Sequence, residues 1–150
     1  MSGTVHIAAP ADAVWSALND PGILRAAIPG CRSFERTGVN EFRGAANVAV
    51  GPVRSVFSGT LRLSEVNLLH SYRVAGEGAS PHSGSAAGTA LITLTPNGQG
   101  TDIHYEVEAA VGGKIAMIGQ RFIDQAAKKM AEDFFLRFSA LTEGKATKSA

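Results

Sequence analysis

Residues 41–111 alternate in hydrophobicity over several long stretches, and one face of that pattern combines a few aromatic rings with many very small residues. The face comprises Phe42, Gly44, Ala46, Val48, Phe57, Gly59, Leu61, Leu63, Tyr72, Val74, Gly76, Ala86, Gly88, Ala90, Ile92, Leu94, Ile103, Tyr105, Val107 and Ala109. Because protein interiors are densely packed, such a face must be approached closely by a partner or leave a hollow. The sequence therefore predicts a curved sheet whose inner face carries a pocket for an apolar molecule.

Helical patterns flank this run of strands. Apolar spacing predicts a first strand over residues 4–8, a short helix over 11–18 and a second over 23–27 capped by Asp20. A broad apolar stripe over residues 114–141 predicts one long helix. We therefore expect an α+β fold in which a curved antiparallel sheet wraps around a long C-terminal helix, with two short helices after the first strand.

The composition fits one domain, which we place at residues 1–143, followed by a short polar tail over 144–150. A net charge of +1 provides no electrostatic footprint for nucleic acid, whose binding usually requires a clustered basic surface. The single cysteine, Cys31, cannot form an internal disulfide, and residues 1–6 lack the pattern of a secretory signal. With no apolar run long enough to span a bilayer, we expect a cytoplasmic protein whose membrane contact is at most peripheral, on the inner face of the cell membrane.

The sequence offers little for catalysis. Its four histidines are scattered without the spacing of metal ligands, and His104, Glu106 and Glu108 alternate onto one outward face of a strand. Residues 84–88 lack the Gly-x-Ser-x-Gly pattern of a nucleophile turn, and residues 76–78 lack the third glycine of a dinucleotide-binding motif. We therefore predict no catalytic residue, no metal site and no cofactor.

Several motifs spread over the chain match a known family. They are Ala9-Pro10, Val14-Trp15, Leu18-Asn19-Asp20-Pro21, Ile28-Pro29-Gly30-Cys31, Val50-Gly51-Pro52-Val53, Gly76-Glu77-Gly78, Val111-Gly112-Gly113-Lys114-Ile115-Ala116, Gly119-Gln120-Arg121 and Phe134-Phe135. On these motifs the sequence resembles the CoxG subunit of carbon monoxide dehydrogenase, a branch of the START-like (SRPBCC) superfamily. The resemblance implies a helix-grip fold of the START/Bet v1-like kind.

The resemblance also implies a function. It points to an accessory protein of an aerobic molybdenum-containing carbon monoxide dehydrogenase or a related hydroxylase. Proteins of this family are associated with recruiting that enzyme to the membrane and with handling respiratory quinone in the pocket. Many members carry a further C-terminal stretch ending in an apolar anchor, whereas this sequence ends in the polar residues 143–150, where we expect no anchor.

Nine residues are candidates for lining the predicted pocket, because aromatic rings set among small residues resemble walls around a space. They are Trp15, Ile28, Phe42, Phe57, Tyr72, Tyr105, Phe122, Ile123 and Ala126. The tyrosine hydroxyls need partners if they are buried, so one could meet a carbonyl oxygen of a quinone. For each aromatic ring, and for Trp15 and Cys31, simple packing in the core is the alternative.

Two loops are candidates for a gate to this pocket. Pro29 and Gly30 form one of them, and Gly112 and Gly113 form the other. Glycines permit backbone movement, but they also build rigid corners, and both interpretations stay open at this point. The leading hypothesis is a non-catalytic carrier of a hydrophobic molecule, with an isoprenoid quinone as the favoured ligand. A docking or assembly factor for the dehydrogenase and a START-like enzyme acting on an apolar substrate are the alternatives.

Overall fold

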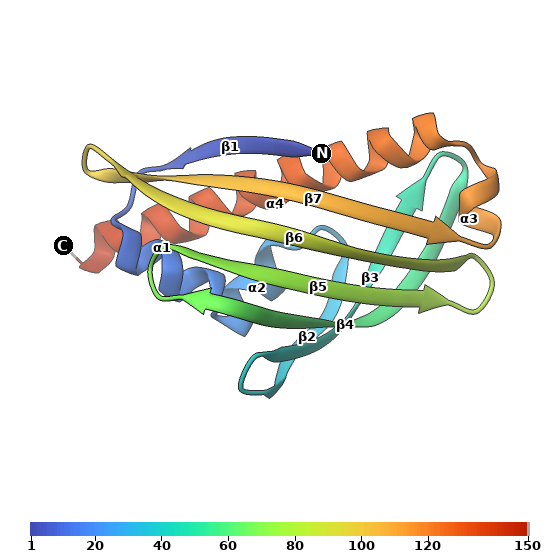
Figure 1. Ribbon diagram of the computed structural model, residues 1–150, viewed down its shortest axis with the longest axis horizontal. Coiled ribbons are helices and arrows are strands. Elements are labelled where there is room, and N and C mark those ends of the chain that lie inside the picture. Colours follow the sequence, from blue (N-terminus) through green and yellow to red (C-terminus); the bar gives the residue numbers. More distant parts are fainter. Residues whose placement is uncertain (150) are drawn as a thin grey trace.

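A computed structural model describes residues 1–149, and it describes the side chains of residues 1–143. One antiparallel sheet of seven strands, in the order β1-β7-β6-β5-β4-β3-β2, curves around the C-terminal helix (Figure 1). The elements are β1 (Ser2–Ile7), α1 (Ala11–Leu18), α2 (Pro21–Ala27), β2 (Cys31–Gly38), β3 (Glu41–Val50), β4 (Val53–Asn67), β5 (Ser71–Ser80), β6 (Gly84–Asn97), β7 (Gly100–Gly112), α3 (Lys114–Met117) and α4 (Gln120–Ser149). The predicted α+β helix-grip architecture is confirmed.

The two short helices begin and end close to where the sequence places them. Asp20 caps α2, because its Oδ1 accepts hydrogen bonds from the backbone N–H groups of Gly22 at 2.8 Å and Ile23 at 3.3 Å. Pro21 occupies the first turn, where its missing N–H group costs nothing, so α2 starts two residues before the predicted boundary.

The prediction of one continuous helix over residues 114–141 is wrong. Gly119 has a φ of +112°, which breaks the helix into α3 and α4. The apolar spacing of Ile115, Ile118 and Phe122 runs across the break, so periodicity alone could not reveal it. At the other end, α4 continues to Ser149 through residues that the sequence assigns to a tail.

The register of the sheet confirms the predicted inner face. Across β3 to β7, the Cα partners form rows that keep the same face: Phe42, Leu61, Gly76, Gly88 and Ala109 form one such row. The neighbouring row consists of Gly44, Gly59, Gly78, Ala86 and Val111. The small residues of separate strands therefore meet in one patch of the concave surface.

The buried core lies at the end of the sheet that faces α1 and the second half of α4. Its buried members are Ile7, Ala9, Val14, Ala17, Leu18, Ala27, Tyr72, Leu94, Ile103 and Phe138. We call this region the filled end. It contains the rows of the inner face farthest from α3, where Tyr72, Ile92 and Tyr105 are paired.

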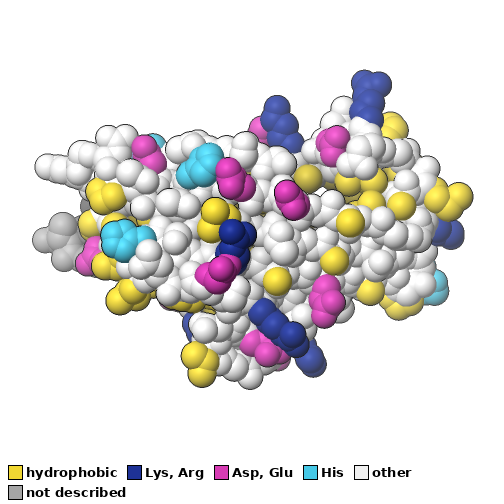
Figure 2. All heavy atoms as spheres, in the orientation of Figure 1, with side chains coloured by type: hydrophobic (Ala, Val, Ile, Leu, Met, Phe, Trp, Pro, Cys, Tyr) yellow, Lys and Arg dark blue, Asp and Glu magenta, His cyan; other side chains and the backbone are white. Residues whose placement is uncertain are grey.

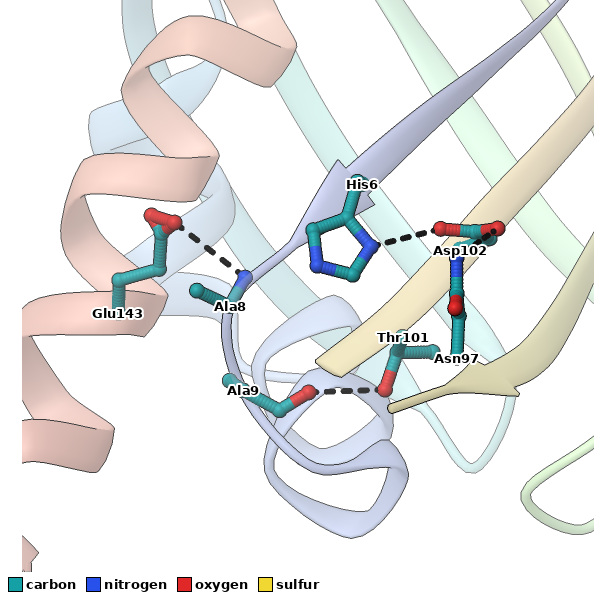
Figure 3. Close-up of polar contacts among 7 residues, drawn as sticks. All are labelled: His6, Ala8, Ala9, Asn97, Thr101, Asp102 and Glu143. Atoms are coloured by element: carbon teal, nitrogen blue, oxygen red, sulfur yellow. Dashed lines mark hydrogen bonds and ion pairs between the residues drawn. The ribbon is translucent and has the colours of Figure 1, made fainter. Parts of the chain in front are cut away.

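Polar contacts fasten the chain at the filled end (Figure 3). Thr101 Oγ1 donates a buried hydrogen bond of 2.8 Å to the carbonyl oxygen of Ala9, and Glu143 of α4 accepts one of 3.3 Å from the Ala8 N–H. His6 and Asn97 both contact the carboxylate of Asp102, at 2.7 Å and 3.1 Å. The N-terminal strand, the β6–β7 turn and α4 are thus joined at one place.

Candidate functional site

The concave face carries an open hollow of about 320 Å³ in the half of the sheet nearer α3. Its lining comes from the α2–β2 turn and from β2 to β7. The inward-facing lining residues are Ile28, Cys31, Phe34, Gly44, Ala46, Phe57, Gly59, Leu61, Gly76, Gly78, Ala86, Gly88 and Ala109. We call this space the inner hollow, and its volume is at the lower end of the range of small-molecule sites.

Close backbone contacts keep larger side chains out of this patch. A Cβ added at Gly59 would overlap the carbonyl oxygen of Glu77, and one added at Gly44 would lie 2.6 Å from the carbonyl oxygen of Ser33. The strands themselves therefore require glycine at these positions. The same requirement leaves the space in front of the strands without side-chain atoms.

The chemistry of the inner hollow is apolar and uncharged. Cys31 donates its S–H to the carbonyl oxygen of Ser33 at 3.3 Å, and burial raises the pKa of its thiol, against smaller lowering effects of that bond and Arg25. The thiol therefore stays neutral at neutral pH. Glu77 borders the inner hollow from β5, but strand alternation directs its side chain to the convex face.

Broader depressions of about 610 Å³ and 640 Å³ lie on the convex face over β4 to β7. Their linings include Arg62, Glu77 and Glu108. Because the convex depressions carry charged side chains whereas the lining of the inner hollow is apolar, the inner hollow is the better site for an apolar molecule.

Of the nine residues predicted to line a pocket, Ile28 and Phe57 border the inner hollow directly. Phe42 is buried behind it and stacks on Phe34, with ring centroids 5.2 Å apart. Phe34 itself lines the inner hollow, and the sequence analysis missed it. Its position in the alternating pattern of β2 was the available signal.

The predicted lining residues Trp15, Tyr72 and Tyr105 lie outside the inner hollow. Trp15 and Tyr72 meet edge to face in the core, with ring centroids 5.4 Å apart, and burial raises the pKa of Tyr72. Tyr105 stacks on Phe135 of α4 at 5.0 Å and borders a groove between β1 and α4. For Trp15 and Tyr72 the geometry is that of core packing, the alternative that the sequence left open.

Phe122, Ile123 and Ala126 lie on the first turns of α4. Phe122 leaves 43% of its surface exposed and packs against the β3–β4 turn, where a Cβ added at Gly51 would lie 3.3 Å from its ring. Ile123 and Ala126 are half-buried. This half of α4 therefore crosses the concave side of the sheet without the tight burial of its second half.

Both predicted gate loops are built as tight corners. A Cβ added at Gly30 (φ +69°) would lie 2.5 Å from the Asn47 carbonyl oxygen, and Asn47 donates a 2.9 Å hydrogen bond back to Gly30. A Cβ added at Gly113 (φ +79°) would lie 2.7 Å from the Cα of Gly84. Pro29 and Gly112 are the half-buried neighbours of these two positions.

Gly119 is the unconstrained joint in this region. A Cβ added there would have no heavy atom within 4 Å, although its φ of +112° still favours glycine. The sequence analysis gave Gly119 no role, because a glycine within an amphipathic pattern is compatible with an unbroken helix.

Two further searches of the described residues bear on function. Among residues 1–149, no group of three or more His, Cys, Asp and Glu side chains could hold a metal ion. None of the helices over the same residues is long and apolar enough to cross a membrane.

The fold places the protein in the START/Bet v1-like helix-grip class, and solved structures support this. A conserved protein from Geobacillus kaustophilus is similar, with a TM-score of 0.87, 29% sequence identity, and coverage of 94% of this chain and 93% of that one. A protein from Thermus thermophilus has a TM-score of 0.71 at 13% identity, covering 97% and 98% of the two chains. Ara h 8.0201 has a TM-score of 0.67 at 12% identity, covering 95% of each chain. At the last two identities the likeness shows the fold alone.

Within that class, residues 3–141 match the family of the CoxG subunit of carbon monoxide dehydrogenase, and the chain belongs to this family. The resemblance found in the sequence motifs is thereby confirmed. No curated protein sequence matches the chain.

Proposed function

We propose that this protein is a non-catalytic accessory protein of a molybdenum-containing carbon monoxide dehydrogenase or a related hydroxylase. It carries a hydrophobic ligand in the inner hollow and couples the enzyme to the membrane. The observation that carries the proposal is an uncharged hollow of about 320 Å³ on the concave face of a CoxG-family protein. Catalysis resides in the partner enzyme.

A respiratory quinone is the ligand that best suits this lining. Its ring and isoprenoid tail are apolar, and Ile28, Phe34, Phe57 and Leu61 offer apolar walls against which they can pack. Its two carbonyl oxygens need only a few donors, and one of them would take the place of the Ser33 carbonyl oxygen as the acceptor of the weak Cys31 S–H donor. The small residues at the floor allow a flat ring to approach the strands closely.

Titration of the purified protein with a water-soluble short-chain quinone tests ligand binding, using intrinsic fluorescence or calorimetry. Ala109→Leu places a larger side chain in the inner hollow, and we expect it to weaken binding at least tenfold. Ala110→Leu is the matched control, because the neighbouring residue faces the convex side of the same strand and we expect unchanged binding. Equal affinities of the two variants would refute the inner hollow as the site.

Native mass spectrometry after mild purification from a cell that makes quinone provides a second measurement. We expect a bound mass that corresponds to a quinone and that is lost in Ala109→Leu. A protein consistently free of lipid in both measurements would contradict the carrier role.

A docking or assembly factor without ligand transfer is the second candidate. The exposed convex face with its broad depressions is the observation that favours it. Co-purification with the dehydrogenase subunits separates the two: if Ala109→Leu preserves both complex formation and electron transfer to quinone, docking alone is the function. We expect complex formation to persist and electron transfer to fall.

A further inference from the structure

At one end of the molecule, the charged side chains of three segments are all basic. This end is formed by residues 50–54 of the β3–β4 turn, 80–84 of the β5–β6 turn and 112–122 around α3, and we call it the α3 end. Arg54, Lys114 and Arg121 are exposed there, together with His82. These three segments contain no Asp or Glu. Asp124, the next acidic residue along α4, accepts a 2.8 Å hydrogen bond from Gln120.

The same end exposes apolar side chains. Met117 has 85% of its surface exposed, and Phe122 has 43%. Figure 2 shows this end on the right, where yellow, dark blue and cyan side chains gather at the rim of the molecule. Exposed apolar side chains accompanied by basic residues are typical of surfaces that lie in the interfacial region of a membrane.

The segments of the α3 end are held together by packing and hydrogen bonds. Ile115 is buried, and its N–H donates a 2.8 Å hydrogen bond to the carbonyl oxygen of Ser83 in the β5–β6 turn. On the other side, Ile118 and Phe122 pack against Gly51 of the β3–β4 turn. Three segments that are distant in sequence thus hold Met117 and the basic residues together.

Charge is distributed differently at the opposite, filled end. There the acidic residues Asp12, Asp20, Asp102 and Glu143 lie around α1, α2 and the β6–β7 turn, and several of them are engaged in hydrogen bonds. Arg25 of α2 and Arg36, which donates to the Asn19 carbonyl oxygen, lie at that end as well, so its charge is mixed, whereas the three segments of the α3 end carry basic residues without acidic ones. Such an asymmetry would orient the molecule in the field of an anionic surface.

We propose that the α3 end docks onto the surface of an anionic lipid bilayer. Met117 and Phe122 enter the headgroup region, while Arg54, Lys114 and Arg121 pair with lipid phosphates. The proposal names the surface through which the membrane coupling of the proposed function would occur. The proposal rests on the proposed function for the reason why the protein would dock. Docking itself does not require a ligand in the inner hollow.

Sedimentation with vesicles tests the docking. The full chain is mixed with vesicles of phosphatidylcholine, with or without phosphatidylglycerol, at low and at high salt. We expect binding to the anionic vesicles, weakened by salt because the phosphate contacts are exposed. Each basic residue near an anionic surface contributes on the order of fivefold in partitioning, so the triple variant R54Q/K114Q/R121Q should lose roughly a hundredfold.

Two variants make the test specific. R32Q/R43Q/R137Q removes the same charge from exposed positions elsewhere, and we expect it to keep most of the binding. Met117→Ser keeps all charges, and we expect a loss of several-fold that persists at high salt. Equal losses in the two triple variants would overturn the proposal, as would failure of the wild-type protein to bind anionic vesicles at low salt, which would leave an acidic protein as the partner.

Failure of docking and failure of the carrier function can be told apart. The variant R54Q/K114Q/R121Q should titrate with the water-soluble quinone like the wild-type protein. Ala109→Leu should lose the quinone and still sediment with anionic vesicles. Circular dichroism of each variant establishes that it is folded, so that a loss of binding reports on the surface itself.

Discussion

Both halves of α4 carry phenylalanines that face the sheet, but these side chains are buried to different extents. Phe138, in the second half, is completely buried among the residues of the filled end, whereas Phe122, in the first half, leaves 43% of its surface exposed. The strands opposite explain the difference. Tyr72, Leu94 and Ile103 project toward the second half of α4, while the strands nearer α3 present glycine and alanine.

This contrast separates the stabilising core from the proposed binding site along one sheet. The filled end buries large apolar side chains and anchors α4 through contacts such as the hydrogen bond between Glu143 and Ala8. The hollow half also buries Phe42, but its glycines and alanines leave a space of about 320 Å³. A carrier benefits from this division, because the site can receive and release a ligand while the other end keeps the chain folded.

The largest expected effect comes from emptying the filled end. Phe138→Ala should lower the free energy of unfolding by about 3–5 kcal/mol, since it creates a cavity in a fully buried cluster. Leu136→Ala, on the exposed side of the same helix, should change it by less than about 0.5 kcal/mol. Denaturant unfolding measures both values. A small effect at Phe138 would mean that the filled end does not dominate stability.

The next effect concerns the strands behind the inner hollow. Gly59→Ala should cost about 1–3 kcal/mol, because the added Cβ overlaps the carbonyl oxygen of Glu77 and must push β4 and β5 apart. Gly112→Ala is the matched control: its Cβ would lie 3.4 Å from Ser85 Oγ, an ordinary contact. Thermal unfolding compares the two, and similar melting temperatures would contradict this account of the glycines. Leucine at Gly59 would therefore be an unsuitable way to fill the pocket.

A third pair of variants adds the same side chain at each end. Ala27→Leu at the filled end should cost about 1–3 kcal/mol, because the site has no room for additional atoms. Ala109→Leu in the inner hollow should change the free energy of unfolding by less than about 1 kcal/mol, since space is present there. If both substitutions destabilise the protein equally, the hollow is not free volume.

The smallest effect is a pH dependence at the filled end. The hydrogen bonds from His6 and Asn97 hold the pKa of Asp102 below its ordinary value of 3.8. This contact therefore stabilises the fold above that value, and its contribution disappears as the pH falls through the lower pKa of the folded state. Asp102→Asn should lower the melting temperature slightly at neutral pH and leave it unchanged in strong acid.

The control for this measurement is Glu35→Gln, which removes an exposed carboxylate on β2. Its melting temperature should follow that of the wild-type protein at every pH. A difference between wild type and Asp102→Asn that grows toward acid would have the wrong sign and would contradict the assignment.

Much of the fold could be predicted because its local signals agree with one another. Alternation identified the inner face, and the register of Phe42, Leu61 and Gly76 confirms it. Asp20 was correctly identified as the cap of α2, although the helix begins two residues before the predicted boundary. The break at Gly119 could not be predicted, because the apolar spacing continues across it and a single glycine is tolerated in many helices.

The site was predicted only in outline. Phe57 borders the inner hollow, but Tyr72 packs against Trp15 in the core, although Phe57 and Tyr72 are both aromatic residues of the predicted inner face. Alternation tells which face of a strand a residue occupies, but it does not tell how far that residue is from the helix opposite. Phe34 was missed for another reason: the predicted inner face begins at residue 41 and leaves out the alternation of β2.

By itself, the sequence determined the family, the α+β class and the composition of the concave face, because these depend on motifs and periodicities within short segments. Only the tertiary structure decided where that face is filled and where it is hollow, and that Arg54, Lys114 and Arg121 share one end. The physical reason is that packing and surface charge depend on distances between segments remote in sequence, which are set when the sheet curves around α4.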